Sequence, residues 1–138
     1  MTVATSEDLA GIALFESLEP EARAAIAPWF ELQDVSPGVN LTGEGAAGYS
    51  FFILRDGAAT VSIDGDQVRT LGAGDFFGEL ALLVDDGARV ARVRAMTPVR
   101  CVSIPREDFL ELVETEPAFA LHLLRELARR LVEARATA

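Results

Sequence analysis

A glycine followed by a short acidic and apolar run, Gly78-Glu79-Leu80-Ala81-Leu82-Leu83, is the segment of this sequence best suited to binding chemistry. Good helix formers dominate residues 79–83, and a single helical turn there would leave backbone N–H groups unpaired near Gly78. Unpaired donors and the helix dipole both favour an anion, and a residue without Cβ lets a phosphate approach the backbone closely. The segment therefore predicts a phosphate site.

The strand expected to follow supplies a cation for the same site. Because side chains alternate between the two faces of a strand, one face carries Arg89, Ala91, Val93 and Ala95, and the other carries Val90, Arg92, Arg94 and Met96. The first set is small and apolar apart from its arginine, so we expect it to face the interior. An inward guanidinium needs a partner, and a phosphate suits it because the planar fork binds two oxygens at once.

The role of Glu79 is less direct. A carboxylate does not fit as a phosphate ligand, but it would accept a hydrogen bond from a sugar hydroxyl attached to that phosphate. Glu79 and Arg89 could instead pair with each other across the loop and stabilise the turn with no ligand present. Residue types alone leave both interpretations open.

Longer motifs around this segment resemble a known family. Phe77-Gly78-Glu79-Leu80-Ala81-Leu82-Leu83 followed by Arg89-x-Ala91-x-Val93 resembles the phosphate-binding cassette of the cyclic-nucleotide-binding domain family, with the spacing of its bacterial catabolite-activator branch. Residues 45–57, with Gly45, Phe51-Phe52-Ile53-Leu54 and Gly57, resemble the family's glycine-and-strand signature, and Pro37-Gly38 resembles the turn before its second strand. The resemblance covers about residues 14–131.

This resemblance implies a role for each residue of the cassette. Gly78 and the backbone of Glu79, Leu80 and Ala81 would approach the cyclic phosphate. The Glu79 carboxylate would take the ribose 2′-hydroxyl, and Arg89 would pair with the exocyclic phosphate oxygens.

The resemblance also bears on the choice of base. Val90 would line the phosphate site where the family usually has Ala or Ser, so it offers no hydroxyl there. Arg92 stands where Thr or Ser would favour guanine, which favours cyclic AMP over cyclic GMP. The family's final helix caps the base, which places candidate base contacts around residues 121–125.

The elements that must position these residues are helices, then many short strands, then helices. Ser6 is a candidate helix cap, Pro20 suits a first helical turn, and Asp64-Gly65 predicts a tight hairpin. Expected helices cover residues 6–14, 21–27, 105–116 and about 118–134, and expected strands include 51–54, 58–63 and 67–71.

Close spacing of short strands favours an antiparallel jelly-roll β-barrel over βαβ units, and the resemblance implies an eight-stranded roll. The predicted fold class is mainly β with flanking helices. We expect a single domain over residues 1–138, with a helical N-terminus at 6–28, a barrel at 29–104 and C-terminal helices at 105–135.

Charge and composition exclude several classes of partner. Acidic residues outnumber basic ones by 22 to 12, for a net charge of −10, and every basic residue is arginine. Such a surface repels nucleic acid and anionic lipid, and no apolar run approaches the length of a membrane span. The single cysteine, Cys101, is expected to be a buried inert thiol and fits a reducing compartment, so a cytoplasmic protein is predicted.

An enzyme is not expected. A cupin-like jelly roll with a metal would need clustered histidines and carboxylates, whereas the one histidine, His122, falls on the final helix. No histidine lies beside Cys101 or a strand-borne serine to complete a nucleophilic triad. We therefore expect no catalytic residue, no metal and no cofactor, the ligand being cyclic AMP with cyclic GMP as the second candidate.

The final helix is the expected output element. Its apolar residues repeat at heptad-like spacing, which favours a homodimer, although packing on its own barrel is the alternative. The members of this seam are Ala120, Leu124, Leu127, Leu131 and Ala134.

The predicted function is a regulatory sensor that binds a cyclic nucleotide and signals through its C-terminal helices to a protein partner or a fused domain. The alternative is a ligand-free jelly-roll interaction or dimerisation module with a vestigial cassette. The catabolite-activator branch continues into a DNA-binding module, and none is found in these 138 residues. We therefore expect a stand-alone sensor or the regulatory piece of a longer protein.

Overall fold

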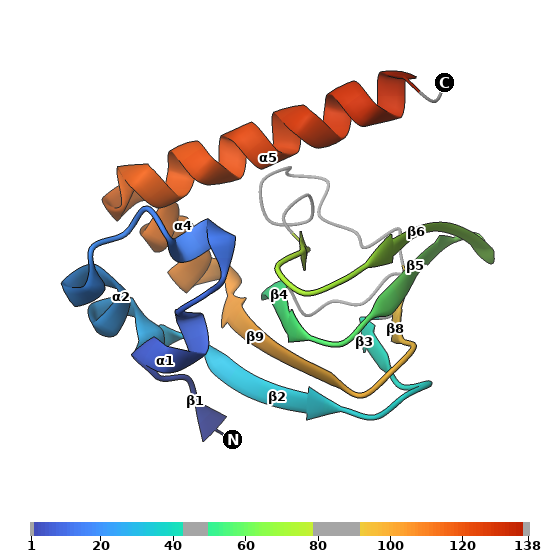
Figure 1. The fold of residues 1–138 in the computed structure, drawn as a ribbon, viewed down its shortest axis with the longest axis horizontal. Coiled ribbons are helices and arrows are strands. Elements are labelled where there is room, and N and C mark those ends of the chain that lie inside the picture. The colour runs from blue at the N-terminus through green and yellow to red at the C-terminus, as the bar shows by residue number, and fades with distance from the viewer. Residues whose placement is uncertain (1, 43–49, 79–91, 137–138) are drawn as a thin grey trace.

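Two antiparallel β-sheets and a layer of helices form the protein (Figure 1). The computed structural model describes residues 2–42, 50–78 and 92–136. One sheet has five strands in the order β1-β2-β9-β4-β7, and the other has four in the order β3-β8-β5-β6. The strands are β1 (Thr2–Val3), β2 (Glu31–Val35), β3 (Asn40–Thr42), β4 (Ser50–Asp56), β5 (Ala59–Ile63), β6 (Asp66–Leu71), β7 (Phe76–Phe77), β8 (Arg92–Ala95) and β9 (Val99–Pro105).

The described helices lie between β1 and β2 and after β9 in the sequence. They are α1 (Ser6–Leu9), α2 (Pro20–Ile26), α4 (Arg106–Thr115) and α5 (Pro117–Ala136), with single 3-10 turns η1 (Ala13–Phe15) and η2 (Ala27–Trp29). Within the described ranges, no helix combines the length and the apolar character needed to cross a membrane.

The first helix is shorter than the sequence predicted. Thr5, not Ser6, is its N-cap, and the Thr5 backbone N–H donates to Asp8 Oδ2 at 2.7 Å. The helix ends at Leu9 because Gly11 follows with φ 82°, in the left-handed region that ends a helix. The second helix begins at Pro20, as predicted from the missing N–H of proline.

Strand β4 lies between two apolar cores and explains the continuous run Phe51–Leu54. Phe51 and Ile53 pack with the helices, while Phe52 and Leu54 pack against the four-stranded sheet. A strand buried on both faces needs apolar side chains at successive positions. The five-stranded sheet is therefore the middle layer, with helices on one face and the second sheet on the other.

The predicted jelly-roll class with flanking helices is confirmed, and the described strands do not close into a barrel. Among the described residues the strands pair as two separate sheets. The sheets face each other across a shared apolar cluster, so side-chain burial rather than a continuous hydrogen-bond ladder closes the interior. The predicted Asp64-Gly65 hairpin between β5 and β6 is confirmed, since φ is 53° and 84° and a type I′ turn needs both values positive.

Four phenylalanines anchor the C-terminal helices to the middle layer. The ring of Phe119 on α5 stacks 5.7 Å from Phe15 and meets Phe51 edge-on at 6.4 Å, measured between centroids. Phe109 on α4 lies 4.7 Å from Phe51. All four rings are fully buried, so the first turn of α5 is fixed in the core.

Candidate functional site

The predicted phosphate site begins where β7 ends. Strand β7 pairs with β4 through Phe77 and Phe52, whose rings stack at 4.8 Å, and Gly78 follows directly. Its φ of 97° lies in the region that favours glycine, as expected for a turn into a phosphate-binding segment. The other predicted site residues lie outside the described residues: Glu79, Leu80, Ala81, Arg89 and Val90.

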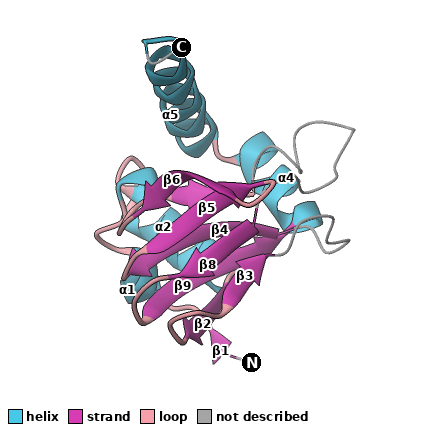
Figure 2. Ribbon diagram, turned by 90° about the vertical axis from the view of Figure 1, so that its right-hand side faces the viewer, coloured by secondary structure: helices cyan, strands magenta, loops and turns pink. Residues whose placement is uncertain are grey.

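The alternation predicted for the cassette strand is confirmed over its described part. Val93 and Ala95 on β8 are each 2% exposed, whereas Met96 is 52% exposed and both Arg92 and Arg94 are exposed. The small apolar side chains therefore face the interior, and the two arginines face away from it. Figure 2 shows the four-stranded sheet to which they belong, with none of the described helices in front of it.

The inner face of the four-stranded sheet carries a charged residue that the sequence analysis missed. Cross-strand partners share a face, and Val93 on β8 lies opposite Val61 on β5, which lies opposite Arg69 on β6. Leu71, two residues further along β6, is buried in the core between the sheets. The side chain of Arg69 therefore projects from the inner face of the sheet.

Arg69 is half-buried, and within residues 2–42, 50–78 and 92–136 its side chain makes no hydrogen bond or ion pair. The alternation that identified Arg89 could also have identified Arg69. Arg69 and Leu71 are two residues apart on a predicted strand, so their side chains lie on the same face. The sequence analysis missed Arg69 because it did not establish which face of that strand is buried.

Helix α5 is tied to the strand that leads into Gly78. Arg130 donates from Nη2 to the carbonyl oxygen of Phe76 at 2.8 Å, and its Cζ lies 3.9 Å from the centroid of the Phe76 ring. Leu121 and Leu124, in the segment predicted to hold base contacts, are 47% and 63% exposed instead. The contact between α5 and β7 thus comes from a residue outside the predicted range.

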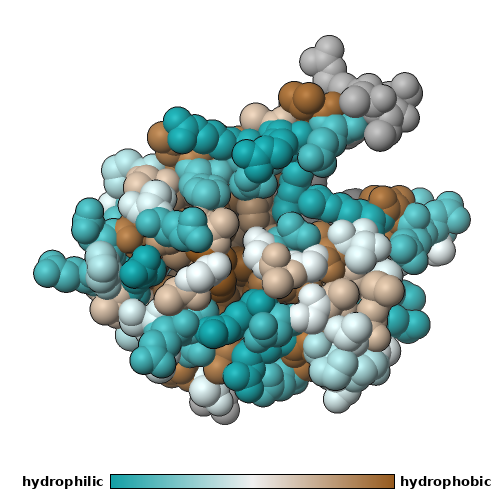
Figure 3. All heavy atoms as spheres, viewed as in Figure 1, coloured by the Kyte–Doolittle hydropathy of each residue, from teal (hydrophilic) through white to brown (hydrophobic). Residues whose placement is uncertain are grey.

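The exposed side chains of α5 include four large apolar ones. Leu121, Leu124, Leu131 and Val132 are exposed, and hydrophobic side chains are visible near the C-terminal end of the helix (Figure 3). The predicted seam is only partly exposed, because Leu127 packs against the core.

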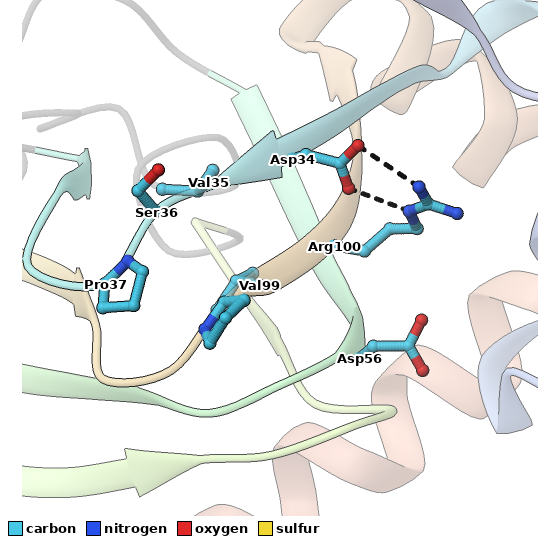
Figure 4. Close-up of a pocket in the computed structure, with 8 residues that line it drawn as sticks. Asp34, Val35, Ser36, Pro37, Asp56, Val99 and Arg100 are labelled. Atoms are coloured by element: carbon cyan, nitrogen blue, oxygen red, sulfur yellow. Dashed lines mark hydrogen bonds and ion pairs between the residues drawn. The ribbon is translucent and has the colours of Figure 1, made fainter.

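A separate open hollow of about 400 Å³ lies where β2 ends and β9 begins (Figure 4). Arg100 donates from Nε to Asp34 Oδ1 at 2.8 Å and from Nη2 to Oδ2 at 3.2 Å. This hydrogen-bonded pair lowers the pKa of Asp34 and raises the pKa of Arg100. The guanidinium is already engaged and Asp56 adds a second carboxylate, so the hollow does not suit an anion. Its lining residues are Asp34, Val35, Ser36, Pro37, Asp56, Pro98, Val99 and Arg100.

The single cysteine lies in the core. Cys101 is fully buried between the sheets, and burial raises the pKa of its thiol to about 11, so the thiol stays protonated and unreactive, as predicted. In the part of the chain that the structure describes, no three His, Cys, Asp or Glu side chains lie where they could hold a metal ion.

Comparison with known proteins gives a consistent result. The family model described as "Cyclic nucleotide-binding domain" matches residues 32–116. The chain is 38% identical over 104 residues to a cAMP-dependent protein kinase regulatory subunit of Colletotrichum orbiculare, a match that covers 74% of this chain and 26% of that protein. It is 40% identical over 105 residues to a cGMP-dependent protein kinase of Eimeria tenella, covering 76% of this chain and 10% of that protein.

A solved structure agrees with these matches. The catabolite activator protein of Thermus thermophilus superposes with a TM-score of 0.77 at 30% identity, covering 90% of this chain and 60% of that one. The chain spans about a quarter or less of the two kinase relatives, so it corresponds to one part of much longer proteins.

Proposed function

Because the chain belongs to the cyclic nucleotide-binding domain family, we propose that it is a non-catalytic sensor whose cassette binds a cyclic nucleotide and whose C-terminal helices pass the signal on. The observation that carries this proposal is the match of the family model to residues 32–116, which include the whole predicted cassette. The positive φ of Gly78 and the inward alternation of β8 support it, because both are needed to bring a phosphate against backbone donors.

In the proposed site, the cyclic phosphate meets the backbone from Gly78 to Ala81 and is paired by Arg89. The Glu79 carboxylate accepts a hydrogen bond from the ribose 2′-hydroxyl, and Val90 lines the phosphate side without donating. A charge-assisted hydrogen bond contributes about 1.5–3 kcal/mol, so two from one guanidinium supply a large share of a micromolar affinity of about −8 kcal/mol.

Cyclic AMP is the first ligand to test, with cyclic GMP second. Position 92 carries an arginine and not the Thr or Ser that would favour guanine, and this arginine faces away from the interior. The relatives support both choices, because one is named as a cAMP-dependent and another as a cGMP-dependent protein.

The proposed output runs through α5. Its exposed apolar residues Leu121, Leu124, Leu131 and Val132 would be covered in a homodimer or by a protein partner, since clustered apolar side chains on a surface mark interaction sites. Ligand binding would shift the position of α5, and with it the surface offered to that partner. We propose a cytoplasmic location, consistent with a single buried thiol.

The test is thermal unfolding with cyclic AMP, cyclic GMP and 5′-AMP. At a hundredfold excess over its dissociation constant, a ligand adds about 2.7 kcal/mol to the free energy of unfolding. This increase raises the melting temperature by a measurable amount. We expect the rise with a cyclic nucleotide and not with 5′-AMP. Arg89→Ala should abolish it, while the matched variant Arg94→Ala, which removes an exposed arginine from the outer face of β8, should keep it.

A flat response to both cyclic nucleotides at millimolar concentration would count against the sensor. The ligand-free interaction module, with α5 as its contact surface, would then be the better account.

A further inference from the structure

The outer face of the four-stranded sheet carries two exposed arginines on one strand of a chain whose net charge is −10. Arg92 and Arg94 lie two residues apart on β8, and their side chains point away from the core between the sheets. We infer that this outer face is a docking surface for an extended acidic segment of a protein partner. The inference is independent of the proposed function, because the cyclic nucleotide is proposed to bind on the opposite side of the same sheet.

Arg94 lies in a row of polar side chains that crosses the sheet. Its partner on β3 is Asn40 and its partner on β5 is Thr60. Thr60 in turn lies opposite Thr70 on β6. Cross-strand partners share a face, so these four side chains project from the outer surface. Arg94 donates from Nε to Asn40 Oδ1 at 3.2 Å, which orients the guanidinium, while its two Nη groups make no hydrogen bond to the described residues.

Arg92 begins a second row of the same character. Its partner on β5 is Ser62, which lies opposite Gln67 on β6. Gln67 donates from Nε2 to Thr70 Oγ1 at 3.4 Å, so the two rows are neighbours on one face. Every cross-strand partner in the two rows therefore has an uncharged side chain that can form hydrogen bonds with a docked segment.

The charge of this face is opposite to that of the chain. Acidic residues outnumber basic ones by 22 to 12, yet neither Arg92 nor Arg94 forms an ion pair with a described carboxylate. By contrast, Arg55, Arg100 and Arg129 each pair with an Asp or a Glu. Protein interfaces are enriched in arginine and depleted in Asp and Glu, and the two rows have this composition. None of the described helices covers the sheet, which leaves the face open to a partner (Figure 2).

The spacing of the two arginines indicates what the partner presents. Side chains two residues apart on a strand lie about 7 Å apart, so the sheet offers two guanidinium forks at that distance. Each fork can bind one carboxylate through two hydrogen bonds. An extended segment has the same repeat, so glutamates at alternate positions of the partner would place one carboxylate on each arginine. Nucleic acids and anionic membranes fit less well, because they extend far beyond this face and the net charge of −10 repels them.

The experiment is fluorescence anisotropy of a labelled peptide of alternating glutamate and serine, titrated with the full chain at low ionic strength, where exposed charges are least screened. We expect binding that weakens as salt is added. The double variant Arg92→Gln/Arg94→Gln should weaken it by about 5- to 30-fold, as expected for the loss of two exposed ion pairs. Arg125→Gln/Arg129→Gln is the matched control, because it removes two exposed arginines from α5 and changes the net charge equally.

A second peptide tests the spacing. It has the same number of glutamates placed three residues apart, so no two of them fall at alternate positions, and it should bind more weakly than the alternating peptide. The assignment is overturned if the alternating peptide does not bind, if the two double variants weaken it equally, or if the two peptides bind equally well.

The choice of partner has its own test. Tighter binding of single-stranded DNA or of phosphatidylserine vesicles through Arg92 and Arg94 would overturn the assignment to an acidic protein segment. Thermal unfolding with cyclic AMP separates the two proposals, because Arg92→Gln/Arg94→Gln should keep any rise in melting temperature that the wild type shows. Loss of that rise in the double variant would contradict the separation of the docking face from the ligand site.

Discussion

Replacing Arg130 by alanine should release the C-terminal half of α5 from the sheet while leaving the rest of the fold intact. Arg130 joins α5 to β7 through two contacts with one residue, a hydrogen bond to the Phe76 carbonyl and a cation–π contact with its ring. The start of the helix is held independently, because Phe119 and Leu123 are buried in the core. Loss of Arg130 should therefore act locally.

These two contacts with Phe76 set the scale of the expected effect. A cation–π contact contributes about 0.5–2 kcal/mol, depending on how far it is removed from water. A hydrogen bond from a charged donor contributes about 1.5–3 kcal/mol when buried, and less here because Arg130 is only partly buried. We expect the docked state of this half-helix to lose about 1–3 kcal/mol, which corresponds to roughly a 5- to 150-fold change in the opening equilibrium.

Native-state hydrogen exchange measures this quantity directly. In Arg130→Ala, amide protection should fall by that factor over residues 124–133 and should stay constant over residues 117–123 and in β4. Arg129→Ala is the matched control, because Arg129 is 63% exposed and pairs with Glu126 on the same helix. Equal protection in Arg130→Ala and wild type would refute the reasoning, as would a uniform loss across the whole protein.

Three further predictions concern the fold and the surface of α5. Gly57→Ala should destabilise the protein by about 2–5 kcal/mol, because its Cβ would lie 2.3 Å from a backbone carbonyl oxygen at φ 97°. Gly65→Ala, at φ 84° with open space around it, should cost only about 1–2 kcal/mol, and urea unfolding compares the two. Cys101 should resist a thiol reagent at pH 8 until the chain is unfolded, since burial raises its pKa to about 11. Leu124→Glu combined with Leu131→Glu should give a monomer in sedimentation analysis without loss of stability, because both side chains are exposed.

Each of these has a result that would count against it. Equal costs at Gly57 and Gly65 would mean that the close approach of the backbone at Gly57 is relieved without strain. Rapid modification of Cys101 in the folded protein would show that the space between the sheets opens readily. An unchanged oligomeric state in the double leucine variant would remove α5 from the proposed dimer interface.

Local rules predicted several features of the structure correctly. The positive φ of Asp64 and Gly65, the start of α2 at Pro20 and the alternation along β8 each depend on a few neighbouring residues. The error at α1 was also local, because Thr5 competes with Ser6 for the cap and Gly11 ends the helix early.

Features that depend on distant pairing were not predicted. The short strand β1 is recognisable only because Thr2 and Val3 pair with β2. The division into two sheets depends on which strands neighbour one another, and sequence spacing does not carry that information. Arg130 looks like one of two equivalent arginines in the sequence, and its contact with Phe76, 54 residues away, distinguishes it.

The predicted heptad-like seam correctly indicated that α5 is amphipathic, but it combined side chains from two different faces of the helix. One stripe of α5 is turned toward the protein and consists of Phe119, Leu123, Leu127 and Arg130. A second stripe is turned outward and consists of Leu121, Leu124, Leu131 and Val132. The predicted seam took Leu127 from the first stripe and Leu124 and Leu131 from the second. Because the two stripes are separate, docking through Arg130 and the proposed association through the leucines do not compete for the same side chains. A change in the docking of α5 would therefore move the outer stripe as a unit, which is what an output helix requires.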